Sequence, residues 1–188
     1  MQFAKDSFLL ALQQRLGGLN PARTVTINGA TVPAVVAVEN LPPSCAEPQP
    51  NTFYIEWGSA AVIDGHAGNG ALMSLQSVIS YYTLGTAQST VDRGRMLGQL
   101  DDELLAICQP TNTEKFDYSQ SPSVDLGTTV FWNPPAFQEA TTSGVEDNTL
   151  AYQGRAVRRA MYKQAYQDGR VERRATLTVF FFSEVTLL

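Results

Sequence analysis

Two segments of the sequence repeat their apolar residues at the spacing of an α-helix, and their separation by strand-like runs constrains the fold more than any other feature. The first segment covers residues 4–16 and ends at Gly17-Gly18, which favour a helix C-terminus. We therefore expect an amphipathic helix near the start of the chain. The apolar residues on its common face are Phe8, Leu9, Leu12 and Leu16.

The second helical segment covers residues 90–108 and ends before Pro110. Ser89 precedes it, and Asp92 lies at the offset of a capping box. Three consecutive carboxylates, at positions 101–103, point in different directions on a helix, so we interpret them as a solvated face rather than a metal site. The apolar face of this helix consists of Met96, Leu97, Leu100, Leu104 and Ile107.

Several other runs are rich in β-branched and aromatic residues, as is typical of strands. Asn28-Gly29 joins two of them and can adopt the positive φ angles of a type I′ turn, which predicts a hairpin. Residues 111–128 lack such a pattern, and we interpret them as a loop. The further predicted strands cover 52–63, 72–85 and 128–135.

Together these elements predict the fold class. With 44% apolar and 16% charged residues, the 188-residue chain can bury a core, and its length fits a single domain over residues 1–188. Because the strands are grouped between helices, we expect an α+β domain with a mainly antiparallel sheet, on which the N-terminal and central helices pack. No run approaches the roughly 18 apolar residues of a membrane-spanning helix, so we expect a soluble protein without membrane contact.

Positive charge is concentrated in residues 155–174, which hold 7 of the 13 basic residues. Seven basic and two acidic side chains give this segment a net charge of +5, which leaves −10 for the rest of a chain whose total is −5. A fold alone does not require such segregation. We therefore predict that an anionic partner binds this segment.

Asp168-Gly169 predicts a two-residue turn within the basic segment, with strands on both sides. Pairing outward from this turn places Lys163 directly opposite Arg174, and like charges in that position cost a few tenths of a kcal/mol. We predict that the outward face meets an acidic protein surface, which a neighbouring copy of this chain could supply, with nucleic-acid phosphate or solvent as alternatives. The cations on that candidate interface are Arg159, Lys163, Arg170 and Arg174. The opposite face, expected to meet the core, includes Val171, Arg173, Ala175, Leu177, Val179 and Phe181.

The residues that most often carry catalysis are sparse. His66 is the only histidine, and the glycines around it match no phosphate-binding motif. Cys45 lies among prolines with no nearby base, and Cys108 is far from it in sequence. We therefore predict no catalytic residue, no cofactor and no metal site. A small hydrolase that uses Cys45 or His66 is the alternative from the enzyme class.

The order of elements resembles that of the tail terminator, or tail completion, proteins of long-tailed bacteriophages. The resemblance rests on the N-terminal helix "FAKDSFLLALQQRL", the strand "SVISYYTLGT" that leads into the helix "VDRGRMLGQLDDELLAI", and the C-terminal strand "ATLTVFFFSE". Members of that family are small α+β domains without a catalytic site, and they form a hexameric ring that caps the finished tail tube. No functional residue is carried over from the family to this sequence.

The resemblance implies a virion structural protein of the tail and neck, assembled in the cytoplasm of a bacterial host. Its implied partners are other copies of itself in a ring, the tail tube protein below and a neck or connector protein above, with incidental contact to DNA that passes through the ring. Two other classes remain as alternatives. One is another phage neck or tail component, such as a head-completion or tube-like protein, and the other is a nucleic-acid-binding module that uses the basic segment.

Overall fold

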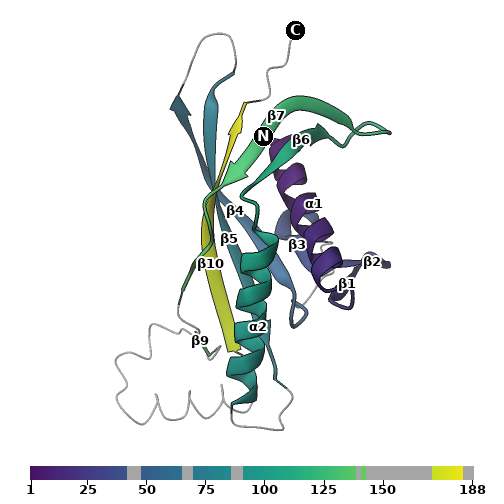
Figure 1. The fold of residues 1–188 in the computed structure, drawn as a ribbon, viewed down its shortest axis with the longest axis vertical. Helices are drawn as coiled ribbons and strands as arrows, with labels where there is room; N and C mark the ends of the chain where they lie inside the picture. The colour runs from purple at the N-terminus through teal and green to yellow at the C-terminus, as the bar shows by residue number, and fades with distance from the viewer. Residues whose placement is uncertain (42–47, 65–69, 86–90, 139–140, 143–170, 184–188) are drawn as a thin grey trace.

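The computed structural model describes residues 1–41, 48–64, 70–85, 91–138, 141–142 and 171–183. These residues form two α-helices, one large sheet and a separate two-stranded hairpin (Figure 1). The large sheet has 8 strands in the order β3-β4-β5-β10-β7-β6, with β8 and β9 also paired to β10. Only β3 and β4 pair in parallel, so the predicted α+β fold with a mainly antiparallel sheet is confirmed.

The helices are α1 (Gln2–Leu19) and α2 (Asp92–Ile107), with a 3-10 turn η1 (Val38–Asn40). The strands are β1 (Thr24–Ile27), β2 (Ala30–Pro33), β3 (Val35–Ala37), β4 (Phe53–Asp64), β5 (Leu72–Thr83), β6 (Asn112–Asp117), β7 (Val124–Trp132), β8 (Ala136–Phe137), β9 (Thr141–Thr142) and β10 (Val171–Phe182). The predicted strands over 52–63 and 72–85 correspond to β4 and β5.

Both helices bury the faces that their periodicity predicts. In α1 the four predicted apolar residues are buried, but the helix continues through Gly17-Gly18 to Leu19. The predicted stop is wrong because tertiary packing of the helix outweighs the roughly 1 kcal/mol that each helical glycine costs. In α2 Met96 is half-buried, and its N-cap position is Val91, without a side-chain cap, whereas Ser89 lies outside the described residues. The buried face of α2 consists of Leu97, Leu100, Leu104 and Ile107.

The Asn28-Gly29 turn is formed as predicted. Asn28 has φ 51° and Gly29 has φ 78°, and Ile27 pairs with Ala30 across the two-residue loop. Because both central residues need positive φ angles, the local sequence alone specifies this hairpin between β1 and β2.

Residues 111–128 are not the predicted loop, because they hold β6 and the start of β7. Because many of these residues are polar, their pattern did not indicate strand β6, which is partly buried. Lys115 is only 2% exposed, and its Nζ donates to the carbonyl oxygen of Phe182 at 2.9 Å. A buried cation with such a partner is compatible with a strand, although its sequence pattern does not indicate one.

The predicted pairing of Lys163 with Arg174 is wrong. Arg174 pairs with Ser80 of β5, and on the other side its carbonyl oxygen accepts a hydrogen bond from the Gln138 backbone N–H at 2.8 Å. Strand β10 has β5 along one side and β9, β8 and β7 along the other. Residues 155–170, the other part of the basic segment, lie outside the described residues.

The alternation predicted for β10 is nevertheless correct. Its core face carries four buried residues, namely Ala175, Leu177, Val179 and Phe181. This face packs with both helices in one apolar core. The period of two therefore predicted the buried side of the strand, even though the local turn rule chose the wrong neighbour.

Candidate assembly surface

The outer edge of β4 is only partly paired. Strand β3 pairs with Phe53, Tyr54 and Ile55, after which the chain turns away into η1. From Glu56 onward, no strand among the described residues pairs with the outer side of β4. We call residues 56–64 along this side the open β4 edge.

Most side chains of the open β4 edge are exposed. Trp57 is half-buried, whereas the residues from Gly58 to Asp64 are exposed on both faces. Val62 is 61% exposed and Ile63 is 51% exposed, although both are large and apolar. The far ends of β4 and β5 extend away from the two helices, at the top of the view in Figure 1. Exposed apolar residues on a strand with one unpaired edge are typical of an interaction site.

A hollow of about 320 Å³ adjoins the start of the open β4 edge. It is lined by Val38 and Glu39 of η1 and by Ile55, Glu56 and Trp57 of β4. The Lys5 ammonium forms an ion pair with Glu39 at 2.8 Å and lies 5.5 Å from the centre of the Trp57 ring. The start of the open β4 edge therefore lies beside the carboxylates of Glu39 and Glu56 and the ring of Trp57.

A second hollow, of about 250 Å³, lies on the other side of Glu56. Tyr54 and Tyr82 line it, and the hydroxyl groups of both form hydrogen bonds with the backbone of residues 48–49. The Tyr54 hydroxyl accepts from the Gln49 backbone N–H at 2.6 Å, and the Tyr82 hydroxyl donates to the Pro48 carbonyl oxygen at 2.6 Å. Arg174 also lines this hollow.

Arg174 is the one residue of the predicted interface that the structure describes. Its side chain is 61% exposed, and its Nε lies 3.5 Å from Glu172 Oε1. Arg159, Lys163 and Arg170 lie outside the described residues, so they are not placed relative to Arg174. The sequence analysis did not single out Glu56, which belongs to both hollows, because a lone glutamate in a strand carries no motif.

The edge at the other end of the sheet is covered. Helix α1 lies along β6, where the Phe116 backbone N–H donates to Ser7 Oγ at 3.0 Å. Arg15 of the same helix donates to the Asn112 carbonyl oxygen at 2.7 Å. Two backbone groups of β6 are thus bonded by side chains of α1, and we call this side the closed β6 edge.

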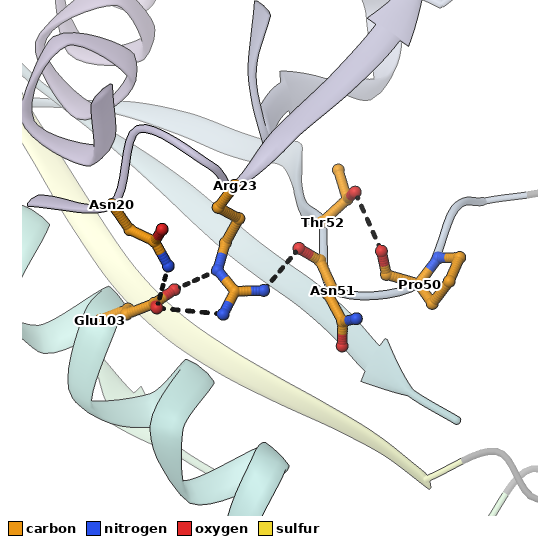
Figure 2. A network of polar contacts seen from close by, with 6 residues as sticks. All are labelled: Asn20, Arg23, Pro50, Asn51, Thr52 and Glu103. Carbon is orange, nitrogen blue, oxygen red and sulfur yellow. Dashed lines mark hydrogen bonds and ion pairs between the residues drawn. The ribbon is translucent and has the colours of Figure 1, made fainter. Parts of the chain in front are cut away.

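Two of the three adjacent carboxylates of α2 fasten the helix to the rest of the domain. Glu103 forms an ion pair with Arg23 and accepts from Asn20 Nδ2 at 2.8 Å (Figure 2). Asp101 accepts from the Tyr81 hydroxyl and lies 3.4 Å from Arg173 Nε. The interpretation as a solvated face is therefore correct for Asp102 but wrong for the other two, which turn to opposite sides of the helix and satisfy buried polar partners.

The thiol that the structure describes is unsuited to nucleophilic chemistry. Cys108 is fully buried, and this burial raises its pKa to about 12, although nearby Arg15 acts in the opposite direction. The thiol is therefore protonated at neutral pH, and a thiolate is the reactive form. Cys45 and His66 lie outside the described residues.

The described residues offer neither a metal site nor a membrane-spanning helix. No three His, Cys, Asp or Glu side chains in this part of the chain are placed to hold a metal ion. Neither α1 nor α2 has the length and apolar character that a helix needs to cross a membrane.

Solved structures include similar chains, one of them from a virion. No family model matches the sequence, and no curated protein matches it. The chain is similar to a chain in the structure titled "Virion of native gene transfer agent (GTA) particle", at 15% identity and a TM-score of 0.38. The match covers 96% of this chain and 98% of that one.

Proposed function

We propose that this chain is a structural, non-catalytic subunit of a phage-type virion, a tail terminator whose copies form a hexameric ring. The ring caps the tail tube and joins it to the neck. The order of elements that resembles the tail terminator family supports this proposal, and the observation that carries it is the open β4 edge.

The open β4 edge is a template for pairing with another chain. Unpaired strand edges are normally shortened, charged or covered, because their free N–H and C=O groups recruit other strands. In this domain α1 covers β6, whereas β4 presents nine residues that include Val62 and Ile63. A domain that acts alone gains nothing from such an edge, but a subunit of an assembly uses it as a contact.

A ring requires a contact between two different surfaces of the same chain. Such head-to-tail contacts close into rings when the rotation between subunits is a fraction of a full turn. Because α1 covers β6, the open β4 edge of one copy cannot form a ring by pairing with β6 of the next. A ring contact through the open β4 edge therefore needs a different segment of the neighbouring copy as its partner.

Tail length tests the proposed function. The protein should be produced together with the tail tube and tape-measure proteins of the same particle, and the tails measured by electron microscopy. We expect capped tails of uniform length, with six copies of the chain at the end distal to the baseplate or tip. Omitting the protein should give tubes of uncontrolled length. Uniform tails without it, or its absence from the tail end, would contradict the proposal.

A further inference from the structure

We propose that the open β4 edge binds the basic segment 155–163 of a neighbouring copy as an added strand. This inference rests on the proposed ring, because it names the contact that joins one subunit to the next. Addition of a strand to an open edge obtains affinity from main-chain hydrogen bonds and specificity from side chains.

The surface around the edge is acidic. The open β4 edge and the two hollows beside it carry four carboxylates and two cations. The carboxylates are Glu39, Glu56, Asp64 and Glu172, and the cations are Lys5 and Arg174. Glu56 is exposed between the two hollows and forms no ion pair with any residue that the structure describes. Its carboxylate is therefore available to a cation from another chain.

Segment 155–163 has the complementary chemistry. Its nine residues, "RAVRRAMYK", match the nine residues of the open β4 edge in number. They contain no acidic residue, and their apolar members, including Val157 and Met161, suit contact with Val62 and Ile63. The cations of the segment are Arg155, Arg158, Arg159 and Lys163.

Strand β10 already has neighbours in its own chain. The sequence predicts that segment 155–163 pairs with residues 174–182, but β10 has strands on both of its sides. The sides of β10 where the segment was expected are thus occupied, while the open β4 edge, of equal length and acidic, has no further strand beside it in the described part of the chain. Pairing between copies supplies that strand, and repetition around the ring gives every copy the same contact.

Reciprocal charge reversal tests the contact. One variant carries Glu56→Lys, and a second carries Glu in place of all four cations of segment 155–163. Assembly of the full chain is measured by sedimentation at high protein concentration and by electron microscopy on the ends of tail tubes. Each variant alone should fail to assemble, because its edge and segment repel each other. A 1:1 mixture should regain the wild-type oligomer, because each interface between unlike copies then joins opposite charges.

Glu114→Lys on the closed β6 edge is the matched control, since it reverses another exposed strand glutamate, and it should assemble like the wild type. Wild-type assembly by either variant alone, no recovery in the mixture, or no wild-type oligomer in solution or on tubes would each overturn the inference. Uniform tails capped by the Glu56→Lys variant would overturn the inference while leaving the proposed function intact. A charge-dependent oligomer that does not limit tail length would support the inference and contradict the proposed function.

Discussion

Strand β6, and strand β4 beyond its short pairing with β3, form the two outer edges of the same sheet, but they differ in what lies beside them. Along β6, Ser7 and Arg15 of α1 bond to backbone groups of the strand. Along β4, the cover provided by β3 stops at Ile55, and the outer side of the next nine residues has no neighbouring strand among the described residues. One edge is therefore part of the stability of the monomer, and the other is available for contacts between chains. Mutations should separate these two roles.

The largest loss of stability is expected from the residue that connects both sides of the core. Phe8 of α1 is fully buried and packs edge-on against Trp57 of β4 and Trp132 of β7, at 5.7 and 4.9 Å between ring centres. Phe8→Ala should reduce the free energy of unfolding by about 3–5 kcal/mol, measured by urea denaturation. Leu10→Ala, an exposed site on the same helix, is the control and should cost less than about 1 kcal/mol. Similar losses for the two would show that α1 does not pack as described.

A smaller loss is expected when the closed β6 edge is opened. Ser7→Ala removes the acceptor of the Phe116 backbone N–H and leaves this donor unsatisfied, at a cost of about 1–3 kcal/mol. Amide exchange at Phe116 should accelerate, which a general loss of packing would not confine to one residue. Ser59→Ala on the open β4 edge removes a hydroxyl that contacts Gln76, and it should change stability by less than about 0.5 kcal/mol. Equal losses in the free energy of unfolding for Ser7→Ala and Ser59→Ala would contradict the distinction between the closed β6 edge and the open β4 edge.

The end of β6 adds a pH dependence. The Ser119 hydroxyl donates to Asp117 at 2.6 Å, and Gln120 Nε2 and the Ser119 backbone N–H donate at 2.8 and 2.9 Å, which holds the pKa of this carboxyl below its usual range. A lowered pKa in the folded state means that Asp117 stabilises fully above its unfolded pKa, about 3.9. That contribution is lost as the pH falls through the folded value.

The corresponding measurement compares Asp117→Asn with the wild type at pH 7 and at a series of decreasing pH values. The variant should be less stable at pH 7, and the difference should shrink as the pH falls and the wild-type carboxyl takes up a proton. Asp102→Asn, on the exposed side of α2, removes the same charge without these donors and is the control. A difference that is independent of pH would contradict the role of the carboxylate.

The features that could be predicted from the sequence are those specified by nearby residues. Asn28-Gly29 specifies its turn through backbone conformation, and helical periodicity specifies the buried face of α2. The alternation of apolar residues in β10 predicts its buried face but not its neighbouring strands. The Asp168-Gly169 turn rule considers only residues close in sequence, whereas β10 pairs with β5, which is distant in sequence. Strand β6 was missed because its Lys115 is polar and yet buried. Buried polar residues become recognisable only when their partners, here the Phe182 carbonyl, are known.

From the segregation of cations in the basic segment, the sequence predicts an acidic partner surface, and this stays a prediction. No local pattern in the sequence locates such a surface. The chain leaves β3 and enters η1, so β3 pairs with β4 no further than Ile55, and the rest of the β4 edge stays open. The pairing of β4 with β3 is a tertiary feature. Glu56 acquires significance through that position and not through its residue type.

The smallest effect on folding, with the largest effect on assembly, is expected from charges on the open β4 edge. Val62→Lys with Ile63→Lys places two cations on exposed positions, so the free energy of unfolding should remain within about 0.5 kcal/mol of the wild type. Lysines on an edge strand oppose the addition of a further strand, and here they would also repel a basic partner. Self-association should therefore be lost, as measured by sedimentation. Val124→Lys with Leu126→Lys changes two exposed apolar residues of β7, an inner strand of the sheet, and should leave assembly unchanged. If both double variants assembled normally, the exposed apolar residues of β4 would be surface features without a partner, and the difference between the edges would concern folding alone.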